Sequence, residues 1–391
     1  MVATLEYRGL IWRNNADLEA WLGKRPPEKA LEPDLPIIDP HHHLWDTPAR
    51  GHYFLPELLA DTGGGHNIIS TVFLECQSMF RTTGPEEMKP VGEVEFVNGM
   101  AALSASGQYG KTRACEGIVG WADLMLGSRV RPVLEALIAA GNGRFRGVRY
   151  GTSWDEGVAG KHVSRQIPRH RLLDPKFREG FAELSKLGLT FDSWHFHPQL
   201  PDLVDLARAF PQQTIIVDHV GGVLGVGQYA GKKAEIMPIW KKSLRELAAC
   251  PNVNIKLGGL GMTSFGFGFE FRDVPPSSQE LADTWRPTSS PVSRRSASAA
   301  ACSKATSRPT SSPAAIPSFG TPSRSSPPRP PPRRRLRSIP ARQQGSTGSS
   351  PPDWSRMQSG DVRFGGHYEF RRLRLKSQAS TGVSRPAAAS R

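Results

Sequence analysis

Residues 37–45 read IIDPHHHLW, and this stretch sets the expectation both for the fold and for a metal site. The two isoleucines predict a buried β-strand that runs into the three histidines. Alternate residues of a strand share a face, so His41 and His43 point to one side and His42 to the other. Two imidazoles on one face can hold a single metal ion. We therefore predict that His41 and His43 bind a metal and that His42 packs or caps a loop.

Further apolar runs follow along the chain, separated by segments with helical periodicity. The expected strands are residues 37–44, 69–76, 115–124, 145–152, 189–196, 214–222 and 253–259. The expected helices are residues 94–106, 129–141, 175–188, 200–210 and 235–250. Strands that alternate with single helices pair in parallel through right-handed crossovers, which place the helices outside. The sequence thus predicts an α/β fold, a (β/α)8 TIM barrel that is incomplete because only seven βα units are recognisable.

Polar residues close these strands, where the loops of a TIM barrel carry its chemistry. They are His41, His43, Glu75, Asp123, Arg149, His197, His219 and Lys256. Glu75 and Arg149 either orient an anionic substrate, Arg149 through its two-pronged guanidinium, or form a structural ion pair with each other. For Lys256 we expect a solvated or structural role.

Two further motifs contain candidate histidines. In WHFHPQLPDL, His195 and His197 are two residues apart and share a face, so spacing does not decide between them. Because Pro198 marks the end of the strand, the preference goes to His197. In VDHVGG, Asp218 and His219 precede a glycine turn, where His219 acts as a general base, polarises a carbonyl or supports the turn.

The motifs DPHHHLW, HPQLPDL and VDHVGG, at these separations within a βα repeat, closely resemble the amidohydrolase-related (amidohydrolase family 2) metal-dependent hydrolases of TIM-barrel fold. The resemblance covers about residues 37–287. It implies that His41 and His43 are metal ligands, that His197 is a further ligand or a substrate contact, and that His219 is the acid/base residue. The implied reaction is the attack of activated water on a lactone, ester or amide carbonyl.

The resemblance also sets expectations for cofactors and for alternative reactions. The implied ion is zinc, with manganese as the alternative, and some members of the group work without a tightly bound metal. Metal-dependent decarboxylases share the same barrel and are an alternative. The family supplies a carboxylate or an asparagine from the end of strand eight, a strand that is not recognisable in this sequence.

The composition of the chain changes after residue 287. Residues 288–391 contain 19 of the 50 Lys and Arg residues but only 3 of the 36 Asp and Glu residues, and they are rich in Ser, Pro and Ala. Such a segment cannot bury enough apolar surface to fold. We therefore divide the chain into an N-terminal extension (1–36), a barrel lacking strand eight (37–287) and a disordered basic tail (288–391). An Arg-rich tail also suggests nucleic-acid binding as an alternative function.

A shifted reading frame explains this tail more fully. Codons rich in G and C, read out of frame, yield mixtures of Arg, Pro, Ser and Ala. Codons permitted for residues 300–308, shifted by one base, encode RCMFESNFP, which reads as a β-strand, and the continuation reads as a loop and an amphipathic helix. These would be the missing strand and helix of the barrel. We predict a frameshift near residue 287 and weak or absent activity in this chain.

The cysteines indicate the compartment. Cys76, Cys115, Cys250 and Cys302 are widely spaced and form no C-x-x-C pair, which argues against a disulfide framework and suits a reducing compartment. No segment resembles a membrane-spanning helix. We expect a cytoplasmic enzyme that acts on a small-molecule substrate, with no membrane partner and no nucleic-acid partner, and with a homo-oligomer left open.

Overall fold

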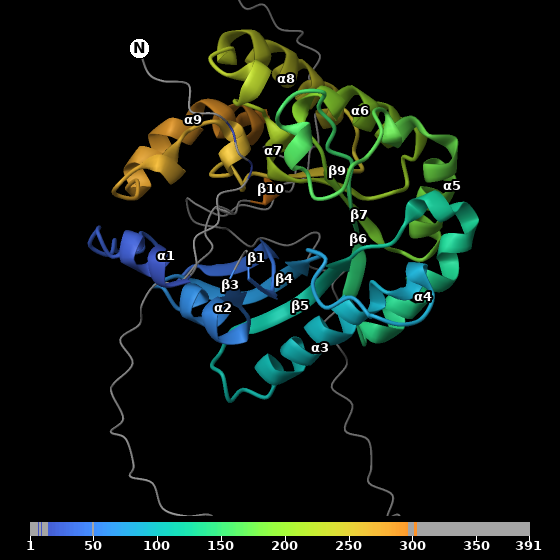
Figure 1. Cartoon of the computed structure of the whole chain (residues 1–391), viewed down its shortest axis with the longest axis horizontal. Coiled ribbons are helices and arrows are strands. Elements are labelled where there is room, and N and C mark those ends of the chain that lie inside the picture. The colour runs from blue at the N-terminus through green and yellow to red at the C-terminus, as the bar shows by residue number, and fades with distance from the viewer. Residues whose placement is uncertain (1–6, 8, 10–14, 49–50, 296–300, 303–391) are drawn as a thin grey trace, which may run out of the picture. The chain divides into compact units, whose positions relative to one another are not determined.

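A parallel sheet organises the part of the chain that the structure describes (Figure 1). This computed structural model describes residues 7, 9, 15–48, 51–295 and 301–302. The strands, in sheet order, are β1 (Pro36–His42), β4 (Asn67–Leu74), β5 (Arg113–Gly120), β6 (Phe145–Gly151), β7 (Thr190–Trp194), β8 (Ile215–Val217), β9 (Val253–Lys256) and β10 (Ala301–Cys302). All neighbouring strands in this series are parallel. The short strands β2 (Trp45–Thr47) and β3 (Gly51–Tyr53) form a separate antiparallel pair.

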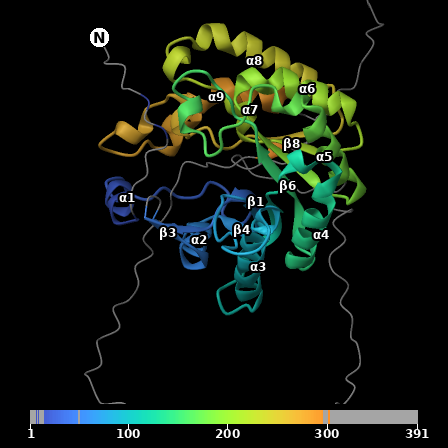
Figure 2. The same ribbon diagram turned by 45° about the vertical axis from the view of Figure 1, so that its right-hand side comes forward.

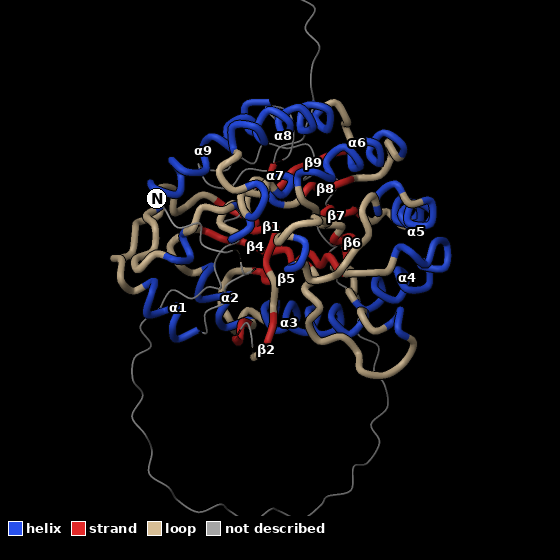
Figure 3. The backbone as a smooth tube through the Cα atoms, turned by 45° about the horizontal axis from the view of Figure 1, so that its top comes forward, coloured by secondary structure: helices blue, strands red, loops and turns tan. Residues whose placement is uncertain are grey.

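Helices connect the strands and surround the sheet, as Figure 3 shows with helices in blue and strands in red. They are α1 (Asn15–Leu22), α2 (Leu55–Thr62), α3 (Val91–Ala105), α4 (Arg131–Ala140), α5 (Pro175–Lys186), α6 (Leu200–Ala209), α7 (His219–Gly222), α8 (Lys233–Ala248) and α9 (Ser278–Arg295). Helices α6 and α8 lie side by side on the outer side of the sheet (Figure 2). The seven expected strands and the five expected helices are all present, with ends shifted by a few residues. The α/β prediction is confirmed.

The sheet curls into an incomplete TIM barrel. Strands β1 and β9 are six steps apart in the sheet, which in a flat sheet would separate them by roughly 30 Å. Nevertheless, His41 Nδ1 on β1 lies 3.2 Å from Lys256 Nζ on β9. The inner faces of the first and seventh strands therefore meet across the interior. Among the described residues, no backbone pairing joins β10 to β1, so the barrel stays open there.

Helix α5 illustrates how local sequence produces an element and then its packing. The Asp174 side chain caps the helix by accepting from the backbone N–H of Lys176 at 2.8 Å, and Pro175 occupies the first turn. The buried Phe181 follows on one face of the helix, and its ring centroid lies 4.9 Å from that of Phe191 on β7. This edge-to-face contact fixes the helix against the outer side of the sheet.

The N-terminal extension contains α1 and is tied to the far side of the chain. Trp21 Nε1 donates to the Arg272 carbonyl at 2.8 Å, and Arg25 Nε donates to the Pro275 carbonyl at 2.9 Å. The segment that precedes β1 thus contacts the segment between β9 and α9. These hydrogen bonds link the two sides of the chain that flank the open part of the barrel.

The expected division at residues 287/288 falls inside a helix. Helix α9 continues to Arg295, and Ala301–Cys302 pair in parallel with Ile255–Lys256 on β9. The structure thus describes a two-residue strand where strand eight was not recognisable in the sequence, and the barrel is incomplete as predicted. Composition shows where apolar residues become rare, but not where a helix that has already begun will end. The disorder and the shifted frame expected for the rest of residues 288–391 lie outside the described residues.

Within the described part of the chain, no helix combines the length and apolarity that crossing a membrane requires.

Candidate active site

Buried ionisable side chains converge at the carboxyl ends of the parallel strands. His41 lies near the end of β1, Glu75 follows β4, Arg149 lies near the end of β6, Asp218 follows β8 and Lys256 ends β9. Each of these side chains belongs to a residue that is at most 9 % exposed. Burial of so many charges is costly unless they pair. The ion pairs and hydrogen bonds among these side chains therefore determine the geometry of the candidate active site.

Lys256 is the cation at the centre of this group. Its Nζ lies 2.5 Å from Asp192 Oδ2, 2.9 Å from Asp218 Oδ1 and 3.2 Å from His41 Nδ1. The solvated role considered for Lys256 is wrong, because the residue is 3 % exposed. Asp192 was not among the residues predicted from the sequence, although an acidic residue inside the apolar run LTFDSW was a signal for it.

Arg149 forms a second cationic contact with the same histidine. Its Nε donates to Glu75 Oε1 at 3.0 Å, so the expected ion pair between these residues is present. Its Nη1 lies 3.4 Å from His41 Nε2 and 3.9 Å from Asp218 Oδ2. Arg165 adds a contact of 3.4 Å to Glu75 Oε2. Glu75 therefore anchors Arg149, and Arg149 faces the histidine and the aspartate.

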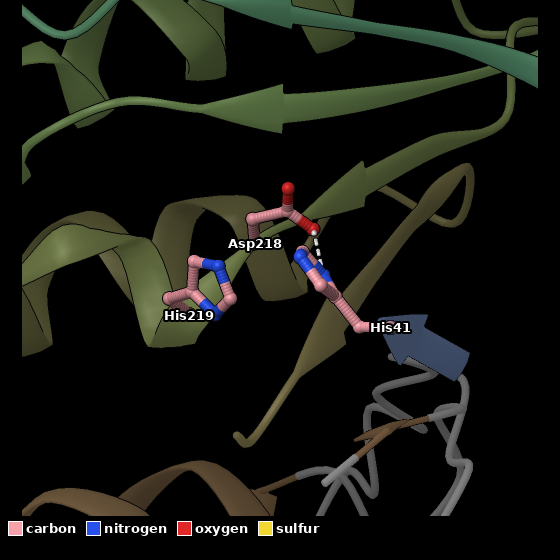
Figure 4. A group of neighbouring side chains, drawn as sticks. All are labelled: His41, Asp218 and His219. Atoms are coloured by element: carbon pink, nitrogen blue, oxygen red, sulfur yellow. Dashed lines mark ion pairs between the residues drawn. The ribbon is translucent and has the colours of Figure 1, made fainter. Parts of the chain in front are cut away.

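His41, Asp218 and His219 form a group that could hold a metal ion. One ligand atom from each lies within 4.8 Å of the others. Figure 4 shows the Asp218 carboxylate beside both imidazole rings, with Asp218 Oδ1 3.7 Å from His41 Nδ1. His219 Nδ1 faces the Gly258 carbonyl oxygen at 3.4 Å. A carbonyl only accepts, so Nδ1 carries the hydrogen and Nε2 keeps its lone pair, an arrangement common in metal-bound histidines.

Burial and neighbouring charges set the protonation of this group. Burial, followed by Lys256, holds the pKa of His41 well below its usual range. Burial lowers the pKa of His219 to about 4. The Asp218 charge acts to raise this pKa, and the charges of Lys256 and Arg149 act to lower it. Burial by itself would raise the pKa of Asp218, but Lys256, His219 and Arg149 together lower it. At neutral pH the group therefore consists of two neutral imidazoles and a carboxylate.

These donors suit a divalent cation. Neutral imidazole and carboxylate are the ligands that zinc and manganese accept in proteins. The unusual feature is that Lys256 and Arg149 lie against the same donors. A bound cation would share Asp218 with the Lys256 ammonium, so its charge would be balanced by Asp192 and Glu75 as well as by Asp218.

A turn of unusual backbone conformation positions His219. His219 and Val220 both have φ of 50°, and Gly222 has φ of 59°. A Cβ at Gly222 would lie 2.0 Å from the His195 carbonyl oxygen, so this position requires glycine. Trp240 Nε1 donates to the Val220 carbonyl at 2.8 Å and holds the turn. Such conformations cost about 1–3 kcal/mol each and persist only where packing enforces them.

The other candidate histidines near β1 lie outside the group of three. His43 donates from Nδ1 to the Leu74 carbonyl at 2.8 Å, and its ring centroid is 5.0 Å from that of His41. His42 lies on the opposite side of the strand, where its Nε2 contacts Thr71 Oγ1 at 2.8 Å.

The pair after β7 divides between two carboxylates. Burial lowers the pKa of His197 to about 4 against the opposing effect of Asp155, and the Leu224 N–H donates to its Nδ1 at 3.2 Å. Burial also lowers the pKa of His195 to about 4, but the opposing carboxylate is Asp218. The Asp218 charge thus acts on His195 and the Asp155 charge on His197, and the preference for His197 as the site residue stays a prediction.

A family model described as amidohydrolase matches residues 38–295. The uncharacterized protein y4mH of Sinorhizobium fredii is 29 % identical over 260 residues, which cover 61 % of this chain and 77 % of that protein. The L-fucono-1,5-lactonase of Burkholderia ambifaria is 25 % identical over 233 residues, which cover 57 % of this chain and 67 % of the lactonase.

Solved structures also match. An amidohydrolase from Burkholderia multivorans with bound zinc has 21 % sequence identity and a TM-score of 0.45, covering 65 % of this chain and 78 % of that chain. Amidohydrolase 2 from Bifidobacterium longum subsp. infantis has 20 % identity and a TM-score of 0.38, covering 65 % and 80 %.

Proposed function

Because this chain belongs to the amidohydrolase family, we propose that it opens small lactones by adding an activated water molecule. The family makes it a hydrolase of small carbonyl substrates, and the similarity to L-fucono-1,5-lactonase supports a lactone. The observation that carries the proposal is the convergence of His41, Asp218 and His219 beside Arg149 at the carboxyl ends of the strands.

The cation would be held by His41, Asp218 and His219. A zinc or manganese ion bound there would polarise the substrate carbonyl and lower the pKa of a water molecule. The neutral imidazoles support this role, because only the unprotonated nitrogen binds a metal. His43, whose Nδ1 donates to the Leu74 carbonyl, is kept as a proposed further ligand, and we assign His197, beside Tyr229, to the substrate and not to the cation.

The other roles in the proposed reaction are assigned to the charged side chains of Asp218, Arg149 and Glu75. Asp218 stays ionised at neutral pH, so it accepts the proton of the attacking water. Arg149 keeps its charge and donates to the carbonyl oxygen, on which negative charge develops. Glu75 positions Arg149 through their ion pair. The expected role of His219 as acid/base residue competes with ligation, since one lone pair cannot do both.

A substrate panel tests the proposal. The full chain, supplied with zinc or manganese, is assayed by proton release against L-fucono-1,5-lactone, other sugar-acid lactones, an aryl ester and an aryl amide. We expect the lactones to give the highest kcat/KM, and Asp218→Asn to lower it by at least about 100-fold, as loss of a general base does. A preference for the ester or amide would contradict the lactone assignment. The decarboxylase and nucleic-acid alternatives gain no support from the family match or the named relatives.

A further inference from the structure

The loop that carries Glu75 has a backbone that its own sequence does not favour. Gln77 has φ of 64° and Met79 has φ of 55°, both in the left-handed region. Neither residue is glycine, and each such position costs roughly 1 kcal/mol or more. The loop therefore needs contacts from elsewhere in the fold to keep its shape.

Glu93, in the first turn of α3, supplies these contacts. Its Oε1 accepts from the backbone N–H of Cys76 at 2.9 Å and of Ser78 at 2.8 Å. The side chain is fully buried, at 0 % exposure. Buried backbone donors are costly to leave unpaired, so these two bonds fix the loop on both sides of Gln77.

The preceding glycine allows the helix to approach the loop. A Cβ at Gly92 would lie 2.7 Å from the Met79 carbonyl oxygen and 2.8 Å from the Arg81 nitrogen. A larger residue would push α3 away from the loop, and the Glu93 carboxyl group would then no longer reach it. Glycine at position 92 therefore permits the contact that Glu93 makes with the loop.

The loop leads directly to the proposed reaction centre. Glu75 precedes Cys76 and pairs with Arg149, which also donates to the Glu75 carbonyl. Arg149 Nη1 in turn lies 3.4 Å from His41 Nε2. A shift of the loop would therefore move Glu75 and, with it, the guanidinium that faces His41 and Asp218.

We propose that Glu93 is a positioning residue, which holds the Glu75 loop so that Arg149 points at the reaction centre. Glu93 does not touch the centre itself, and it acts through two backbone hydrogen bonds and one ion pair. What matters is an acceptor oxygen of the right reach. Glutamine should therefore replace it, whereas alanine should not. The catalytic part of this inference rests on the proposed function, and the positional part does not.

The positional part is tested by labelling Cys76, which is half-buried and whose amide Glu93 holds. The full-length chain is treated with iodoacetamide, and labelling of each cysteine is followed by peptide mass spectrometry. In Glu93→Ala we expect Cys76 to react at least about fivefold faster, because the loop opens locally. Glu93→Gln should react like the wild type, and the buried Cys115 and Cys250 should stay slow and so exclude global unfolding.

A matched control is Glu183→Ala, since Glu183 is also buried on a helix but pairs with Arg131 and Lys186. This variant loses a comparable group away from the site and should leave Cys76 labelling unchanged. If Glu93→Ala does not fold, Glu93→Asp, one methylene shorter, replaces it and should show a smaller increase. Labelling of Cys76 at the wild-type rate in the folded variant would overturn the proposal.

Kinetics test the catalytic part. With a lactone substrate, Glu93→Ala should lower kcat by roughly 10- to 100-fold with a smaller change in KM, because a misdirected Arg149 stabilises the developing charge less. Glu93→Gln should stay within about threefold of the wild type. Faster labelling with unchanged kcat would overturn the link from the loop to catalysis. Absence of lactonase activity both from this chain and from the chain with the restored reading frame would instead refute the proposed function, and the labelling result would still decide the role of Glu93 in the loop.

Discussion

At the residue scale, His41 is the side chain on which the site depends. Each of its ring nitrogens faces a cation, Lys256 Nζ at 3.2 Å and Arg149 Nη1 at 3.4 Å, and Asp218 lies on the Lys256 side. Burial, followed by the Lys256 charge and with a smaller effect of Arg149, keeps the imidazole neutral, which both metal binding and acceptance of hydrogen bonds require. Substitutions of His41 and of its neighbours should therefore distinguish the residues that bind the cation from the residues that stabilise the buried charges.

Replacement of His41 should remove the cation. In His41→Ala we expect bound zinc or manganese to fall at least about tenfold, as measured by elemental analysis after dialysis, because one of three ligands is lost. His42→Ala is the control and should keep the metal, since His42 contacts Thr71 on the other side of β1. Equal losses in both variants would contradict the assignment.

The same measurement on His219→Asn decides between the two roles of His219. Loss of metal, as in His41→Ala, is expected for a ligand. Retention of metal together with loss of activity would instead make His219 the acid/base residue.

Replacement of Lys256 should destabilise the fold. Lys256→Met removes the nearest cation from the buried Asp192 and Asp218 and leaves Asp218 only the more distant Arg149, so we expect the free energy of unfolding to fall by about 3–5 kcal/mol in urea titrations. Adding Asp192→Asn should recover part of this loss. Lys176→Met, which removes an exposed pair with Glu179, should change stability by less than about 1 kcal/mol. Equal midpoints for the wild type and Lys256→Met would refute a central role for this ammonium.

Glu93 should make stability depend on pH. Burial, followed by the Glu75 carboxylate, raises the pKa of Glu93 to about 8 from its usual 4.5. Between these values the unfolded chain ionises this group while the folded chain keeps it protonated, so stability falls as pH rises through the interval. The stability of Glu93→Gln relative to the wild type should grow by up to about 1.4 kcal/mol per pH unit there. A difference that does not change between pH 5 and pH 8 would contradict the raised pKa.

At the scale of elements, helix α9 has a first part that packs against the core and a later part whose sequence disfavours a helix. Trp285 is partly buried against the core and Thr288 is 2 % exposed. Pro287 and Pro291 lie within the helix range, and proline offers no backbone N–H for a helical hydrogen bond. Each such proline costs about 3 kcal/mol in a helix interior. The second half of α9 should therefore be the weaker half.

Hydrogen exchange tests this difference within α9. We expect amides of residues 290–295 to exchange at least about 100-fold faster than those of residues 281–288, read by mass spectrometry of overlapping peptides. Helix α8 is the control, because it also contains a proline, Pro238. Its later residues include the fully buried Trp240 and Leu247, so they should stay protected. Uniform protection along α9 would show that packing outweighs both prolines.

At the scale of the whole described unit, the barrel has seven parallel strands and a two-residue eighth. An open sheet exposes unpaired backbone at its edges, which favours aggregation. The hydrogen bonds from Trp21 and Arg25 to Arg272 and Pro275 link the chain on both sides of this opening. They replace only a small part of what a full strand and its helix would provide, so the chain should be less stable than a closed barrel.

The DNA that encodes the chain tests the predicted frameshift. Resequencing around the codons for Trp285 to Thr288 should reveal an inserted or missing base, and the restored frame should continue through RCMFESNFP into an amphipathic helix. The restored protein should unfold more cooperatively and hydrolyse lactones faster than this chain, because a full eighth strand completes the hydrogen bonding of the barrel. A stop codon before that stretch in the alternative frame would exclude the frameshift.

Local sequence was sufficient for the seven longer strands of the sheet and for five helices, but not for α1, α2, α9 or the short strands β2 and β3. Strand and helix periodicity predicted seven strands and five helices, because backbone geometry repeats every two or 3.6 residues whatever surrounds it. The same rule separated His41 from His42 on β1. The glycines after Asp218 also predicted a turn. The structure gives the reason for one of them, because a Cβ at position 222 would meet the His195 carbonyl oxygen.

Contacts between distant residues were decided only by the tertiary structure. His41 and Lys256 are 215 residues apart, and no local pattern predicts that curling of the sheet brings their nitrogens to 3.2 Å. The roles of Asp192 and of the Glu93 contact with the Glu75 loop depend on the same packing. Burial then shifts the pKa values of these groups by desolvation and by charges from other strands, which spacing along a chain does not encode.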